Sequence, residues 1–108
     1  MKDCKVNVLG TEYKIEFVNF EGEETDGLCD PMARLIKIRN DNTNNVGDFE
    51  ELQKRVLRHE IIHAFMYESG LGVNWQHAEQ FGHDETTVDW FAIQSPKMIK
   101  VFQELDIL

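Results

Sequence analysis

The stretch Arg58-His59-Glu60-Ile61-Ile62-His63-Ala64 organises this chain, and the pattern within it is H-E-x-x-H. Two histidines four positions apart on a helix differ by about 40° in direction and about 6 Å along the axis, so both rings leave one face. A single metal ion can then contact both rings, and neutral imidazole is the commonest zinc ligand. A carboxylate beside them can take a proton from metal-bound water. The stretch predicts a helix carrying a zinc site with ligands His59 and His63 and general base Glu60.

A simpler interpretation of the same residues stays open at this point. His59 and His63 would be ordinary core histidines, satisfied by backbone carbonyls, and Glu60 would lie on a solvated side. A short motif needs its structural context before it defines a site. A third ligand further along the chain would favour the metal.

The motif lies within a helix that the sequence predicts over residues 48–69. Asp48 is a good N-cap, Glu51 completes a capping box, and Ser69-Gly70 suits the C-terminal end. We expect this helix to be central, packed on a sheet, so that burial gives the metal a low-dielectric surround. The predicted core-facing residues are Phe49, Leu52, Val56, His59, Ile62, His63 and Met66, with Ile61, Ala64 and Phe65 widening the face.

Length and composition restrict the class of protein. The 108 residues predict one domain spanning 1–108. A net charge of −9 without a Lys/Arg cluster argues against nucleic acid and anionic membranes as partners. Without a signal peptide or an apolar run of about 18 residues, a cytoplasmic location is expected. Cys4 and Cys29 are then expected as free thiols, Cys29 as a buried thiol rather than a thiolate that reaches the metal.

The first forty residues alternate in the way that strands do. Residues 5–18 predict a β-hairpin that turns at Gly10, and residues 35–39 predict a third strand. The acidic stretch 21–27 and the stretch 40–47 predict loops because turn-forming residues dominate them. The expected result is one three-stranded antiparallel sheet.

Two helices are predicted after a polar connector over 71–82. The first runs from Glu85 to about Gln94, and Ser95-Pro96 ends it. Serine followed by proline is also a helix-start signal, so a second helix is expected over about 96–106. Its predicted core stripe is Met98, Ile99, Phe102 and Leu105.

The third metal ligand is sought among four side chains that follow the motif helix. They are His77, His83, Asp84 and Glu85. The variant with a third histidine six positions after the second is excluded because Ser69 stands there. Glu85 is favoured, since Asp89 lies one helical step beyond it and a carboxylate there can orient a ligand histidine. His83 remains the rival ligand.

These residues resemble a known family. His59-Glu60-x-x-His63 followed by Glu85-Thr86-Thr87-Val88-Asp89 resembles the zinc site of gluzincin metallopeptidases. Residues 85–92 are similar to the third-ligand helix of the ImmA/IrrE group of small zinc peptidases. Length and element order also resemble the single-domain minigluzincins and zinc-peptidase-like proteins of phages and mobile elements. Over residues 5–40 the resemblance is architectural only.

The resemblance implies His59, His63 and Glu85 as zinc ligands and Glu60 as general base and proton shuttle. It also implies Asp89 as a hydrogen-bond partner of the ligand histidine His59. Larger gluzincins use a further His or Tyr to stabilise the oxyanion, and His77, His83 and Tyr67 are the candidates here. No motif chooses among those three.

We therefore predict an α+β, zincin-like domain, with a small antiparallel sheet on a central motif helix, then a Glu-bearing helix and a C-terminal helix. The predicted function is a zinc metallopeptidase, an endopeptidase acting on a peptide or protein substrate, expected as a monomer. The alternative is a non-catalytic, zinc-stabilised binding or regulatory module. The module would need the metal ligands but not Glu60, so Glu60 favours the enzyme, whereas the short chain favours the module.

Overall fold

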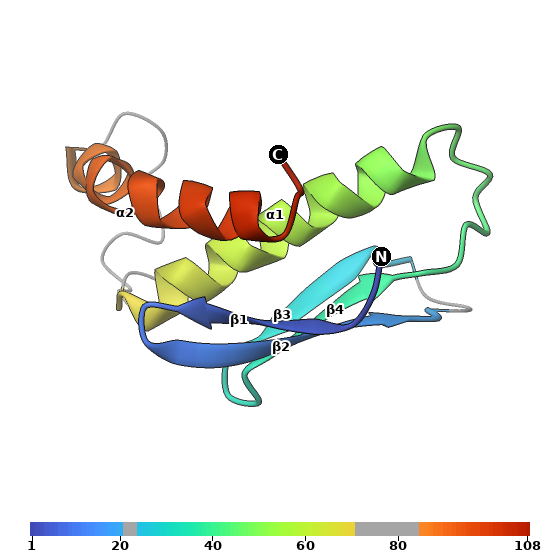
Figure 1. Cartoon of the computed structure of the whole chain (residues 1–108), viewed down its shortest axis with the longest axis horizontal. Helices are drawn as coiled ribbons and strands as arrows, with labels where there is room; N and C mark the ends of the chain where they lie inside the picture. The colour runs from blue at the N-terminus through green and yellow to red at the C-terminus, as the bar shows by residue number, and fades with distance from the viewer. Residues whose placement is uncertain (21–23, 71–84) are drawn as a thin grey trace.

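A computed structural model describes residues 1–20, 24–70 and 85–108, without the side chains of residues 85, 86, 88, 89 and 92. Within these residues both helices lie on one face of a β-sheet (Figure 1). Among the described residues, no helix combines the length and apolarity needed to cross a membrane. The elements are β1 (Cys4–Val8), β2 (Thr11–Val18), β3 (Gly27–Asp30), β4 (Leu35–Arg39), α1 (Phe49–Glu68) and α2 (Glu85–Glu104).

The sheet is mixed and four-stranded in the described part of the chain, with the order β1-β2-β4-β3. β1 pairs antiparallel with β2 and β3 antiparallel with β4, but β2 and β4 run parallel. The prediction of an α+β fold is confirmed, and that of a three-stranded antiparallel sheet is wrong. β3 was missed because four residues that include a glycine and an aspartate give little strand signal. Its hairpin with β4 makes β4 parallel to β2.

The predicted N-terminal hairpin is confirmed. Val6 pairs with Tyr13 across the two strands, and both side chains are buried. Leu9 and Gly10 both have positive φ, 52° and 93°, as a two-residue hairpin turn with the right twist requires. The Gly10 amide donates a hydrogen bond to Asn7 Oδ1 at 2.8 Å, which stabilises the turn.

α1 begins and ends as its caps predict. The Asp48 carboxylate accepts a hydrogen bond from the Glu51 amide at 3.0 Å, and Gly70 follows the helix with φ 85°. The predicted orientation was wrong, however, because His59 and His63 are exposed. Apolar residues surround the second half of α1, so periodicity alone leaves the buried side undecided. The buried residues are Gln53, Leu57, Glu60, Ile61, Ala64 and Phe65.

α2 is one helix, which contradicts the predicted break at Ser95-Pro96. Proline inside a helix removes one backbone hydrogen bond, and packing must compensate for it. Here Trp90 before Pro96 and Phe102 after it are both buried, so the helix is held on either side. The predicted core stripe was also partly wrong, since Ile99 is 45% exposed and Val101 is buried instead.

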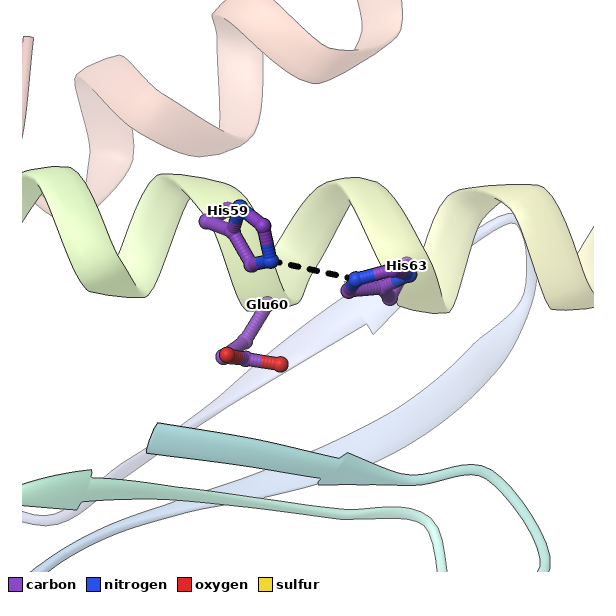
Figure 2. Close-up of side chains that lie close together, drawn as sticks. All are labelled: His59, Glu60 and His63. Atoms are coloured by element: carbon purple, nitrogen blue, oxygen red, sulfur yellow. Dashed lines mark hydrogen bonds between the residues drawn. The ribbon is translucent and has the colours of Figure 1, made fainter. Parts of the chain in front are cut away.

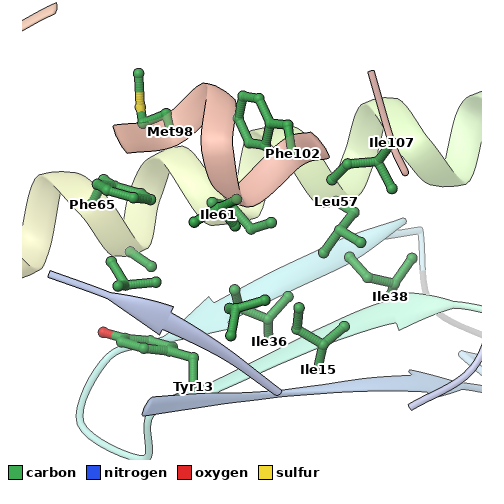
Figure 3. Packing of buried hydrophobic residues seen from close by; sticks show 14 of the residues in the cluster. Tyr13, Ile15, Ile36, Ile38, Leu57, Ile61, Phe65, Met98, Phe102 and Ile107 are labelled. Atoms are coloured by element: carbon green, nitrogen blue, oxygen red, sulfur yellow. The ribbon is translucent and has the colours of Figure 1, made fainter. Parts of the chain in front are cut away.

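The core lies between the sheet and the two helices (Figure 3). Ile61 and Phe65 of α1 face both layers, with strand residues on one side and α2 on the other. Ile107, beyond the end of α2, is fully buried, and Arg58 of α1 donates a hydrogen bond to its carbonyl oxygen. Packing therefore holds α1 from both sides.

Tyr13→Phe should lower the free energy of unfolding by about 1–2 kcal/mol, because Tyr13 Oη donates to Glu68 Oε2 at 2.7 Å from a buried position. Urea denaturation measures the loss. The control is Tyr67→Phe, whose hydroxyl donates only to Met32 Sδ at 3.2 Å, and it should change stability by less than about 0.5 kcal/mol. Equal losses in both variants would contradict the assignment.

Candidate metal centre

Three side chains of α1 come together as a possible metal site. The Nε2 atoms of His59 and His63 lie 3.1 Å apart (Figure 2). A tetrahedral zinc ion with Zn–N distances of 2.0–2.1 Å separates two nitrogen ligands by about 3.3 Å. One ligand atom from each of His59, Glu60 and His63 lies within 4.8 Å of the others. The separation of the two nitrogens is thus close to that of two ligands of one zinc ion.

Glu60 differs from the two histidines in its surroundings. It is only 7% exposed, and its side chain points from α1 toward the sheet (Figure 2). Burial raises the pKa of the Glu60 carboxyl, and the His59 and His63 rings partly oppose that rise. A carboxylate with a raised pKa holds a transferred proton more readily than an exposed one. Glu60 is therefore suited to accept a proton.

The close approach of β3 to α1 depends on Gly27. A Cβ atom at Gly27 would lie 2.7 Å from Val56 Cγ1 and 3.3 Å from Glu60 Cγ. Only a residue without a side chain allows this strand to pass so near the helix. Gly27 therefore sets the position of the Glu60 side chain.

A cavity of about 380 Å³ opens beside the three residues. Its α1 wall consists of Arg55, Val56, His59 and Glu60, and residues 25–27 form the opposite wall. A space of this size falls in the range of small-ligand sites. The exposed His59 ring and the buried Glu60 side chain both border it.

Cys29 lies on β3, two residues after Gly27, and both cysteines are free as predicted. Burial, followed by the Glu60, Asp30 and Glu68 carboxylates, raises the pKa of the Cys29 thiol to about 12. The thiolate is the form that binds metals. At neutral pH Cys29 is a protonated thiol, which fits the predicted role as a packing residue.

The remaining predicted site residues are distributed as follows. Glu85 and Asp89 lie one turn apart in α2, and their side chains are outside the described part of the structure. His77 and His83 also lie outside the described residues. Tyr67 follows His63 by one turn of α1, and its hydroxyl donates to Met32 Sδ. The structure thus brings together His59, Glu60 and His63 among the residues it describes.

The first turns of α2 are tied to the end of α1. Trp90 Nε1 donates to Ser69 Oγ at 2.7 Å, and the Trp90 ring is buried. Ser69 follows His63 by six residues, which is about 9 Å along the axis of α1. The hydrogen bond therefore holds Trp90 of α2, the predicted ligand helix, near this point. The hydrogen bond thus holds the N-terminal part of α2, which begins at Glu85, against the C-terminal end of α1.

The sequence interpretation missed the cavity-lining residues. Arg55 precedes His59 by one helical step, and this spacing could have placed it on the same face. Asp26 and Gly27 gave no such signal, because their position depends on the pairing of β3 with β4. Local periodicity does not predict that long-range contact.

Comparisons with family models, curated protein sequences and solved structures give no match for this chain. The resemblance to gluzincins is therefore carried by residues 59–63 and 85–92, together with chain length and element order. It remains a prediction about this protein. The geometry of His59, Glu60 and His63 is an independent argument for a metal site.

Gly27→Ala should destabilise the protein by about 1–3 kcal/mol, because the new methyl group overlaps Val56 and approaches the Lys37 carbonyl oxygen at 3.2 Å. Urea denaturation measures the loss. The control is Gly47→Ala, where a Cβ atom meets nothing within 4 Å, and it should change stability by less than about 0.5 kcal/mol. Equal stability of the two variants would contradict the close approach.

The stability of the metal-free protein should carry a pH-dependent contribution from Glu60. Its raised pKa means that the native state binds this proton more tightly than the unfolded state, so the contribution falls as pH rises. Glu60→Gln removes it. In excess chelator, the variant should gain stability relative to the native protein between pH 4.5 and pH 7.5, as urea denaturation would measure. A pH-independent difference would contradict the raised pKa.

Proposed function

We propose that this chain is a zinc-dependent metallopeptidase that cleaves within a peptide or protein substrate. The observation that carries the proposal is the 3.1 Å separation of the His59 and His63 Nε2 atoms beside the buried Glu60 carboxyl. Two converging nitrogens with a carboxyl group beside them fit a hydrolytic zinc site, in which a third protein ligand completes the set and the fourth position is left for water.

The roles of the residues follow from their positions. His59 and His63 hold the metal, and Glu85 at the start of α2 supplies the third ligand. A bound zinc ion would supply an activated water and polarise the scissile carbonyl. From its buried position, Glu60 would accept a proton and pass it to the departing amine. Asp89 orients one ligand histidine through a hydrogen bond.

An extended substrate has a place to bind beside the site. β3 is an edge strand within the described residues, because it pairs with β4 and with no other described strand. Its first residue, Gly27, lines the cavity next to Glu60. A peptide can add to such an edge through main-chain hydrogen bonds. An exposed edge next to the cleft is what an endopeptidase requires.

The burial of Glu60 favours the enzyme over the zinc-stabilised module. A buried carboxyl with a raised pKa costs stability at neutral pH, and Glu60 forms no hydrogen bond with a described residue. A module that only bound zinc would gain nothing from this cost. A hydrolase needs the carboxylate as its base.

The proposal is tested by elemental analysis of the native protein and three variants, together with cleavage of an unfolded protein such as casein. We expect one zinc per chain in the native protein and in His83→Ala, and none in His63→Ala or Glu85→Ala. The native protein should cleave casein. Zinc retained by Glu85→Ala but lost from His83→Ala would move the third ligand to His83. Zinc binding without cleavage of any unfolded substrate would favour the module.

A further inference from the structure

We propose that Arg55 makes the cavity beside the metal centre a binding site for a carboxylate of the substrate. The peptidase then prefers a peptide with a carboxylate next to the scissile bond. The carboxylate belongs either to an Asp or Glu side chain or to the C-terminus of the substrate. This inference rests on the proposed function and names its substrate class.

The position of Arg55 places it next to the reacting centre. It precedes His59 by four residues on α1, so the two side chains leave the same helix face about 6 Å apart along the axis. Both residues line the same cavity of about 380 Å³. An extended substrate whose scissile bond lies at His59 and Glu60 can therefore reach Arg55 within about two residues.

The guanidinium of Arg55 is available to a ligand. Arg55 is exposed and forms no hydrogen bond or ion pair with any residue in the described ranges. The acidic residues about one turn before Arg55 on α1 form ion pairs with other basic residues. Glu50 lies 3.7 Å from Lys54, and Glu51 lies 3.6 Å from Arg58.

Arg55 is the one Lys or Arg among the described residues that line the cavity. Asp26 on the opposite wall lies 3.5 Å from the buried guanidinium of Arg39, which partly offsets its charge and also pairs with Asp41 at 2.8 Å. The Glu60 carboxyl would face the metal and its water. The net charge of −9 alone favours basic or neutral substrates. A local cation reverses that preference at one position next to the scissile bond.

Arginine suits this role because its planar fork can donate two parallel hydrogen bonds to one carboxylate. Because Arg55 is exposed and solvent screens the pair, this interaction should change binding by about 2- to 5-fold. A glutamine in the substrate offers neither the charge nor the second acceptor oxygen. A substrate with Glu should therefore be preferred over the same substrate with Gln by this fold-change in binding.

The test uses alanine-based peptides that differ in one residue, Glu or Gln, moved through each position around the cleaved bond. Each is made with a free or an amidated C-terminus, which separates the two sources of the carboxylate. The native protein should show an about 2- to 5-fold higher kcat/KM for the carboxylate at one position. Arg55→Gln should bring that ratio to about one, and Arg55→Glu should invert it. The matched control Lys54→Gln should keep the native ratio.

A second measurement separates this inference from the proposed function. N-acetyl-glutamyl methylamide and its glutaminyl analogue are titrated into the zinc-loaded protein, while NMR follows the Arg55 Nε–H signal, assigned by its loss in Arg55→Gln. A shift with the glutamyl compound alone supports the carboxylate site even in a protein that cleaves nothing. Cleavage without a preference for the carboxylate, or equal shifts with both compounds, overturns the inference and leaves the peptidase intact.

Discussion

Glu60→Gln should lower peptide cleavage by about 10²- to 10⁴-fold, and the protein should keep one zinc per chain. Glutamine has nearly the shape of glutamate but cannot accept the water proton, and removal of a general base has effects of this size. Glu60 is the buried member of the site, whereas the proposed metal ligands His59 and His63 lie on the exposed face. The Glu60→Gln variant should therefore lose activity but keep the metal. Casein cleavage and elemental analysis on the same preparation measure both.

The matched control is Glu50→Gln, on the exposed side of the first turn of α1. It removes one carboxylate from the same helix and should leave cleavage and zinc content at native levels. Glu60→Gln protein that keeps more than about a tenth of the native rate would exclude Glu60 as the base. Loss of zinc from Glu60→Gln would instead make Glu60 a metal ligand.

Ile61→Ala should lower the free energy of unfolding by about 2–5 kcal/mol, because a fully buried side chain is replaced by a cavity. Ile61 contacts the core between the sheet and α2 (Figure 3), where little relaxation can fill the space. A domain of this size has about 5–15 kcal/mol of stability, so the loss is a large part of it. Urea denaturation in excess chelator measures the difference.

The neighbouring residue provides the control for this substitution. Ile62 is partly buried on the flank of α1, so Ile62→Ala should cost about half as much or less. Equal losses at the two positions would contradict the observed orientation of the helix. Because the proposed zinc site exists only in the native state, adding zinc should restore part of the stability of Ile61→Ala.

The two sets of variants test opposite faces of one helix. Ile61 and Phe65 hold α1 between the layers, and His59 and His63 leave its exposed face. Glu60 lies between these faces, buried against Gly27 of β3. The proposed chemistry therefore depends on how rigidly the core holds α1 against the edge of the sheet.

Features that depend on neighbours in sequence were predictable. The Asp48 cap and the Gly70 end follow from local backbone chemistry, and the predicted helix agrees with the observed one to within a residue at each end. The hairpin turn at Gly10 is equally local. Because His59 and His63 are four residues apart, their side chains lie close together on any straight helix. The proximity of the two ring nitrogens could therefore be predicted from the sequence.

Features that depend on distant contacts were decided only by the tertiary structure. β3 has no strand pattern of its own and exists because its backbone pairs with β4, which also makes β4 parallel to β2. α2 continues through Pro96 because buried side chains on both sides hold it. Packing also determined which side of α1 is buried, and this places Arg55 and Glu60 on the wall of one cavity. The sequence by itself determined the local geometry of the candidate site, while long-range burial and strand pairing determined what surrounds it.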